Sequence, residues 1–247
     1  MYPLGYYPHN IHFLWSAASM LGDDRTAIDA AKKTAEKVPT YLLKDSQFHQ
    51  NFASTPILAY LRFGKWNQVL TTPNPGEDYN YMKMIWHYAR GIAFTRVNNL
   101  KEAEEELISL REINTEEEDE RMQNTTKVAI EVVAGEIESS KQNYDSAIKH
   151  LENAVEFEDL LPYDEPSVWY IPTRQSLGAV LLKARQYGKA EKIYKEDLDY
   201  YRNNGWSLKG LYLSLIAQDK VYEAESIRTD FEKAWSEATV EINSSVF

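Results

Sequence analysis

Apolar residues recur along this chain with the period of amphipathic helices, and the pattern repeats. Three segments place a glycine in one helical pattern and an alanine twelve residues later in the next: Gly91 with Ala103, Gly135 with Ala147, and Gly178 with Ala190. A large apolar residue follows each alanine by four positions, namely Leu107, Leu151 and Tyr194. This spacing is typical of a helix that buries one stripe. The small residues let two antiparallel helices approach closely, so the pattern predicts short αα-hairpins.

Weaker copies of the pattern lie on both sides of these segments. The six second-helix anchors then stand at 27, 69, 103, 147, 190 and 224, with intervals of 42, 34, 44, 43 and 34 residues. We expect linkers or longer helices in the long intervals, around 38–47, 113–123 and 159–168. The sequence therefore predicts one all-α domain over 1–247, a right-handed α-solenoid of about six hairpins. Their expected ranges are 9–37, 48–71, 80–112, 124–158, 169–201 and 205–238.

At these residues the chain resembles tetratricopeptide repeat proteins, which have a 34-residue period and the same spacing of small and large residues. Four strings also resemble a family of uncharacterised bacterial repeat proteins. They are Tyr6-Tyr-Pro-His-Asn-Ile-His-Phe-Leu14, Leu61-Arg-Phe-Gly-Lys-Trp66, Trp86-His-Tyr-Ala-Arg-Gly91 and Tyr163-Asp-Glu-Pro-Ser-Val-Trp-Tyr-Ile-Pro-Thr-Arg174. Longer members carry further repeats upstream, so this chain is similar to their C-terminal half.

The resemblance implies a concave groove that is lined by the first helix of each hairpin and binds a peptide or protein segment. The N-terminal end, Tyr2 to Trp15, is apolar. We expect upstream repeats or a second copy of the chain to cover it. The helix expected from Val221 to Glu237 is much more polar, which suits the cap of a repeat array.

Charge and composition narrow the range of partners. Lys and Arg total 27 against 38 Asp and Glu, a net charge of −11, so we expect no nucleic-acid partner. The acidic run at 116–120 predicts a solvated loop or a helix start. The chain has no cysteine and no apolar run long enough to span a membrane. Because no signal-peptide pattern is present, we expect a cytoplasmic protein, although a longer parent chain would reopen this question.

Histidines supply the first group of candidate ligand-binding residues. His9 and His12 lie three apart at the start of the first helix, on the face expected to line the groove with Asn10. His87 lies on the first helix of the third hairpin, and Glu136 follows Gly135 on that of the fourth. The three histidines with a carboxylate would suit Zn²⁺ or Fe²⁺. The alternative is that each histidine packs and hydrogen-bonds internally.

A second candidate group follows the proline-rich segment near residue 165. It contains Trp169, Tyr170 and Arg174, and the planar guanidinium of Arg174 suits a carboxylate. One interpretation is an aromatic and arginine clamp for an anionic group of a peptide. The other is that Arg174 pairs internally with Glu158 or Glu165 and fixes the linker to the helices.

The leading hypothesis is a binding protein that holds a peptide, protein segment or small ligand in its groove. The expected ligand-binding residues are His9, Asn10, His12, His87, Glu136, Trp169, Tyr170 and Arg174. The alternative is a metal-dependent enzyme or metalloprotein with His9, His12 and His87 around the ion and Glu136 or Glu158 as proton acceptor. No nucleotide-binding or serine-nucleophile motif is present. A third hypothesis is a purely structural assembly surface.

Overall fold

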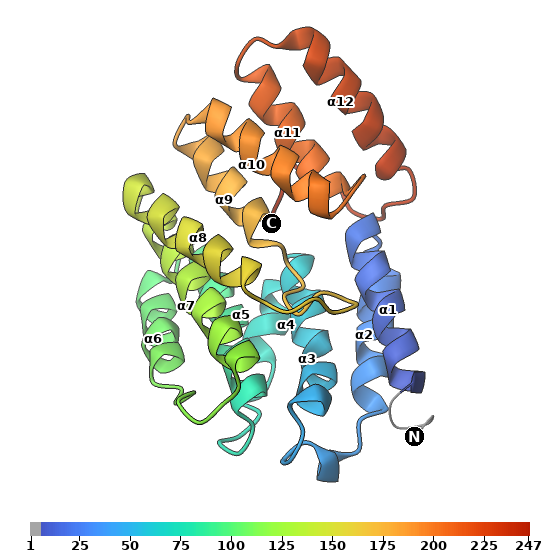
Figure 1. The fold of residues 1–247 in the computed structure, drawn as a ribbon, viewed down its shortest axis with the longest axis vertical. Coiled ribbons are helices and arrows are strands. Elements are labelled where there is room, and N and C mark those ends of the chain that lie inside the picture. The colour runs from blue at the N-terminus through green and yellow to red at the C-terminus, as the bar shows by residue number, and fades with distance from the viewer. Residues whose placement is uncertain (1–5) are drawn as a thin grey trace.

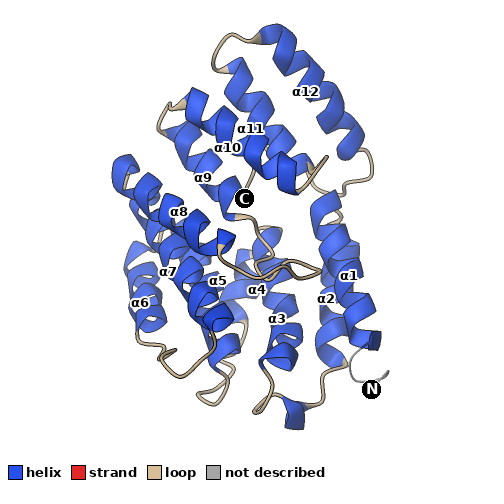
Figure 2. Ribbon diagram, in the orientation of Figure 1, coloured by secondary structure: helices blue, strands red, loops and turns tan. Residues whose placement is uncertain are grey.

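A computed structural model describes the backbone of residues 6–247 and the side chains from residue 8 onward. Tyr2, part of the apolar N-terminal end, lies outside the described residues. The all-α prediction is confirmed, since every regular element in this range is helical (Figures 1 and 2). Within the described residues no helix is both long enough and apolar enough to cross a bilayer.

The α-helices are α1 (Tyr6–Leu21), α2 (Asp24–Glu36), α3 (Gln47–Arg62), α4 (Trp66–Thr71), α5 (Asn80–Arg96), α6 (Leu100–Arg111), α7 (Glu120–Ser140), α8 (Tyr144–Asp159), α9 (Thr173–Lys183), α10 (Tyr187–Tyr200), α11 (Gly205–Ile216) and α12 (Val221–Ala234), with a 3-10 helix at Thr40–Leu42.

The helices pack in consecutive pairs, from α1 with α2 to α11 with α12, and each pair packs on the next. Their bounds differ most from the predicted hairpins at three places, since α12 ends at Ala234 rather than near 238 and the starts of α7 and α9 also differ. α7 begins at Glu120 rather than near 124, because Asp119 caps it by accepting a hydrogen bond from the Met122 amide at 2.8 Å. α9 begins at Thr173, so residues 169–172 belong to the linker. The acidic run is a largely exposed loop and helix start, as predicted.

One turn geometry joins the two helices of every pair. A residue in the left-handed conformation ends each turn: Gly22, Gly64, Asn98, Gln142, Arg185 and Asp219, with φ between 57° and 77°. The next residue donates its amide to the carbonyl five residues earlier, at 2.9–3.1 Å, which satisfies the end of the first helix. Each anchor predicted from the sequence follows its turn by five residues and is completely buried. The turns therefore recur at the same intervals as the anchors.

Two of the three glycines lie under the large residue that the sequence pattern assigns to them. A Cβ on Gly135 would lie 2.7 Å from Leu151, and one on Gly178 would lie 2.4 Å from Tyr194. For a Cβ on Gly91 the nearest atom instead belongs to Val133 of α7, at 2.8 Å. The absence of a side chain at Gly91 therefore allows the next pair to pack closely. The small residues thus permit close approach both within a pair and between pairs.

The chain of pairs turns back until α11 contacts α1 (Figure 1). Trp206, at the start of α11, is fully buried and donates its Nε1–H to the carbonyl of Ser19 at 3.0 Å. The guanidinium of Arg62, on α3, lies 3.8 Å from the centroid of the Trp206 ring. The first and last pairs are therefore joined through Trp206, which also packs against Arg62 of α3.

Buried polar groups join the same helices. Arg62 donates to Gln175 at 2.7 Å, and Gln175 donates to Asp197 at 3.2 Å. Burial raises the pKa of Asp197, and hydrogen bonds from groups such as Ser207 oppose that shift. These side chains come from α3, α9, α10 and α11, so they connect pairs that are distant in sequence.

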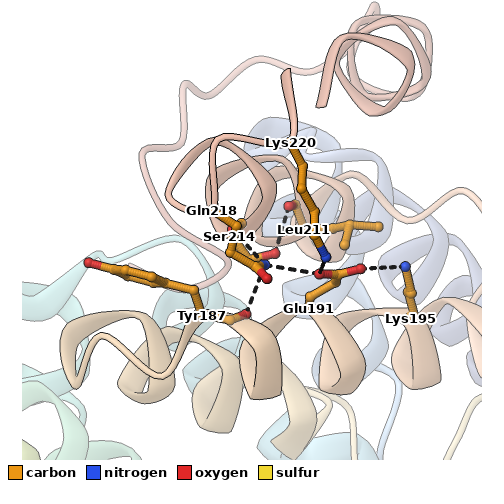
Figure 3. A network of polar contacts seen from close by, with 7 residues as sticks. All are labelled: Tyr187, Glu191, Lys195, Leu211, Ser214, Gln218 and Lys220. Atoms are coloured by element: carbon orange, nitrogen blue, oxygen red, sulfur yellow. Dashed lines mark hydrogen bonds and ion pairs between the residues drawn. The ribbon is translucent and has the colours of Figure 1, made fainter. Parts of the chain in front are cut away.

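Glu191 links α10 to the last pair (Figure 3). Its carboxylate accepts hydrogen bonds from Lys195 at 2.6 Å, Lys220 at 2.7 Å and Gln218 at 2.9 Å. Those from Lys195 and Lys220 chiefly lower its pKa to about 2, so it is ionised near neutral pH. This network fixes the turn between α11 and α12 against α10.

Gly178→Ala tests the close approach of helices. The added methyl group meets the Tyr194 ring, and we expect a loss of about 1–3 kcal/mol in the free energy of unfolding. Gly188→Ala in α10 is the matched control, because its Cβ meets only a Gln218 oxygen at 3.8 Å. Gly188→Ala should raise the free energy of unfolding by up to about 1 kcal/mol, because alanine has a higher helix propensity than glycine. Urea unfolding measures both; similar effects of the two substitutions would contradict the packing described.

Candidate functional site

A cavity of about 180 Å³ lies where α1, α3, α5 and α7 meet the linker 160–172. We call it the His12 cavity. Phe48, Asp164 and Glu165 are exposed at its rim, so it opens to solvent. Its lining mixes aromatic, charged and amide side chains, which suits a site for one or two side chains or a small ligand. The lining residues are His9, His12, Gln47, Phe48, Asn51, Phe52, Tyr81, Asp119, Arg121, Thr125, Asp164, Glu165, Pro166, Val168 and Tyr170.

His12 is buried in an aromatic wall of this cavity. Its ring centroid lies 5.2 Å from Trp15, 4.8 Å from Phe52 and 5.3 Å from Tyr170. Burial, and next the nearby His9, lower the pKa of His12 to about 3, so the ring is neutral at pH 7. Both ring nitrogens are shielded from solvent and have no hydrogen-bond partner among the described residues. His12 therefore shapes the wall as a neutral ring.

His9 and Tyr170 join His12 in this cavity, but Asn10 does not. His9 is half-buried and packs edge-on against Phe13, with centroids 4.8 Å apart. The Tyr170 hydroxyl donates to Asn51 at 2.7 Å and thereby fixes the linker to α3. Asn10 is exposed and is not part of the lining.

His87 lies outside the His12 cavity and has a partner of its own. Its Nδ1 is 2.6 Å from Glu106, and Arg90 donates to the same carboxylate at 2.6 Å. The structure therefore does not bring His87 together with His9 and His12 in one cavity. A search of residues 8–247 finds no group of three or more His, Asp or Glu side chains placed to hold a metal ion. The Zn²⁺ or Fe²⁺ site remains a prediction.

A second cavity, of about 270 Å³, lies on the other side of the linker. We call it the Arg174 cavity. Asp164 and Val168 line both cavities, so the linker separates them. Its lining is rich in carboxylates and tyrosines: Glu158, Asp159, Leu161, Pro162, Tyr163, Asp164, Ser167, Val168, Trp169, Arg174, Asp197, Tyr200 and Tyr201.

The guanidinium of Arg174 is already paired. Nη1 and Nη2 donate to the two oxygens of Asp159 at 2.8 and 2.7 Å, and the group lies 4.9 Å from the centroid of Tyr200. The internal partner is therefore Asp159 rather than Glu158 or Glu165. Asp159 is the last residue of α8 and Arg174 the second residue of α9, so this bidentate pair holds the two ends of the linker together.

Trp169 belongs to the linker, not to a first helix as the hairpin range implied. Its ring is buried and packs edge-on against Tyr88 of α5, with centroids 4.8 Å apart. Trp169 thus anchors the linker to the inner side of the helices. Pro172 follows at the end of the linker and precedes the first residue of α9.

Glu136, expected on the groove face of the fourth hairpin, faces the interior. It is buried and accepts a hydrogen bond from Arg96 at 2.8 Å. This pair borders Val246 and Phe247, far along the chain, rather than the His12 cavity. The predicted site residues are therefore distributed over several places: His9, His12 and Tyr170 line the His12 cavity, and Trp169 and Arg174 line the Arg174 cavity.

Sequence reasoning missed Gln47, Asn51 and Arg121 of the His12 cavity. All three lie in the first turns of α3 and α7, at the end of the stack where the linker crosses. The available signal was weak, because α3 and α7 are separated by α5 and only the polarity of these residues near the helix starts marks them. The bond between Arg121 and Asp164, which joins α7 to the linker, could not be read from spacing.

Comparisons with known proteins add no family to this description. No protein-family model matches the chain, and no curated protein matches it significantly.

Glu158 is an unusual carboxyl group in the Arg174 cavity. Its Oε2 accepts the backbone amide of Thr173 at 2.8 Å. Burial and, to a smaller extent, the charge of Asp197 raise its pKa from 4.5 to about 7. The folded chain thus binds this proton more tightly than the unfolded chain does. The stabilisation from the bound proton is present below pH 4.5 and is lost as the pH rises to about 7.

Glu158→Gln should therefore be more stabilising at pH 8 than at pH 5. We expect the difference to be on the order of 1–2 kcal/mol, which allows for partial solvent screening of the carboxyl group. Glu156→Gln, at an exposed position on the same helix, is the control and should show no such trend. Urea titrations at both pH values measure the effect, and parallel behaviour of the two variants would refute it.

Proposed function

We propose that this chain is a tetratricopeptide-type, right-handed α-solenoid whose inner face binds a peptide, a protein segment or a small ligand. The six equivalent turns and the buried small anchors support the repeat assignment. The same offset between turn and anchor in all six pairs is expected if one supersecondary unit is repeated.

The observation that carries the proposal is the His12 cavity. Four helices and the linker converge there on a solvent-open space with aromatic walls and polar rim groups. Sites that recognise protein segments combine buried aromatic surface with a few placed polar groups. At about 180 Å³ the cavity is small for an extended ligand, so it suits one or two side chains of a bound segment or a small molecule.

The polar groups of the cavity give it a defined chemistry. His12 offers a neutral ring, while Asn51 and Tyr170 are already bonded to each other. His9 and Gln47 line the space and are partly exposed, so they are the groups best placed to meet a ligand. Arg121 is paired with Asp164, and a ligand carboxylate would compete for it.

Substitutions at two adjacent residues of α1 test the proposal. His9→Ala removes a lining side chain, whereas Asn10→Ala removes an exposed one outside the lining. Peptides selected from a phage-displayed random library on the wild-type chain would be titrated against both variants. We expect His9→Ala to weaken binding by about fivefold or more and Asn10→Ala by less than about twofold. Failure to select any peptide, or equal effects at the two positions, would count against this site.

A further inference from the structure

The segment that follows α12 returns to the interior of the molecule. Trp235 donates its Nε1–H to the carbonyl of Val240 at 2.8 Å, which turns the chain away from α12. Thr239 then donates its amide to Gly22 at 3.0 Å and accepts the amide of Asp24 at 2.9 Å. The start of the segment is therefore held on the turn between α1 and α2.

Residues 242–247, which we call the tail, contact four further pairs of helices, namely α3 with α4, α5 with α6, α9 with α10 and α11 with α12. Ile242 and Ser245 are buried. The Ser245 hydroxyl donates to the carbonyl of Gln175 at 2.7 Å and lies 2.7 Å from the Tyr194 hydroxyl, which donates to it. Side chains and backbone of α9 and α10 thus recognise one hydroxyl group.

Phe247 is recognised through its ring and its backbone. The ring packs edge-on against Trp206, with centroids 5.7 Å apart, and lies over Gly64, where a Cβ would approach it to 3.1 Å. Its carbonyl oxygen accepts a hydrogen bond from Nε of Arg96 at 2.7 Å. We call Gly64, Arg96, Gln175, Tyr194 and Trp206 the tail site.

Arg96 is held in place for this contact. Its Nη1 donates to Glu136 at 2.8 Å, and that carboxylate is almost completely buried. The ion pair orients the guanidinium so that Nε remains for the tail. A fixed arginine that contacts a backbone carbonyl recognises an irregular segment independently of its side chains.

The tail is accessible to a competitor. Val246 and Phe247 are only half-buried, in contrast to Ser245. A space of about 30 Å³ also remains between these residues and α3, α5 and α7, with Arg62, Tyr88 and Glu136 in its lining. The tail therefore occupies the inner face without sealing it.

We propose that the tail site is a peptide-recognition site which residues 242–247 occupy in cis, and that its partner is a segment with a hydroxyl residue two positions before an aromatic residue. This inference rests on the proposed function and names a partner chemistry for a second part of the inner face. The spacing of Ser245 and Phe247 supplies the pattern: the hydroxyl meets Gln175 and Tyr194, and the ring meets Trp206. A partner segment with this pattern displaces the tail.

Binding of the tail sequence in trans tests the proposal on the 247-residue chain. The probe is a fluorescent peptide of residues 240–247, followed by anisotropy. In the wild type the attached tail competes at a high effective concentration, so the peptide binds weakly. Phe247→Ala in the protein weakens the cis contact, and we expect the peptide to bind that variant at least about tenfold more tightly. A probe in which Ser245 and Phe247 are both changed to alanine should not bind it.

Three results would overturn the proposal. The first is equal affinity of the probe for wild type and Phe247→Ala. The second is equal binding of the doubly substituted probe. The third is concentration-dependent dimerisation of the wild type that excess probe reverses, which would assign the site to a second copy. Circular dichroism checks the variants, and Ser245→Ala is the milder substitution should Phe247→Ala lose helical structure.

This test is separable from that of the proposed function. A library peptide whose affinity depends on His9 would still bind the His12 cavity if the tail site failed. Conversely, if no peptide binding depended on His9 but the probe still exchanged with the tail, only the His12 cavity would be rejected.

Discussion

The turn inside each helix pair sets the geometry on which the rest of the molecule depends. One left-handed residue reverses the chain, the following amide closes the first helix, and a fully buried small residue five positions later fixes the second helix against the first. Because six turns share this geometry, each pair is placed on its predecessor in a similar way. The linkers between pairs differ in length, and the shortest spans 201–204 whereas the longest spans 160–172.

The consequence of this regular stacking is that the two ends of the array meet. Trp206 contacts Ser19 across nearly the whole sequence, and Arg62 and Asp197 are buried in the same region. The inner face is consequently not an empty groove. The linker 160–172 crosses it, and the tail enters it from the last pair. We propose that a partner uses the solvent-open His12 cavity or exchanges with the tail.

Much of the helical arrangement could be predicted from the sequence, because its causes are local. The pairing of Gly178 with Tyr194 follows from helix periodicity, and polar turns such as that at Asn98 follow from the break in that periodicity. The site was harder to predict, since its contacts join segments far apart in sequence. Nothing in the spacing of Arg174 identifies Asp159 as its partner, and a polar residue such as His12 gives no sign that it is enclosed by aromatic rings.

The last pair of helices is held against the first, so the array is closed. The chain has no cysteine, so Arg25→Cys and Glu232→Cys, at exposed positions on α2 and α12, would carry two spin labels at defined places. Double electron–electron resonance then measures the distance between the ends in solution. A closed array should give one narrow distribution of the distance between the two spin labels. A broad distribution, or a second population at longer distance, would show an open array and contradict it.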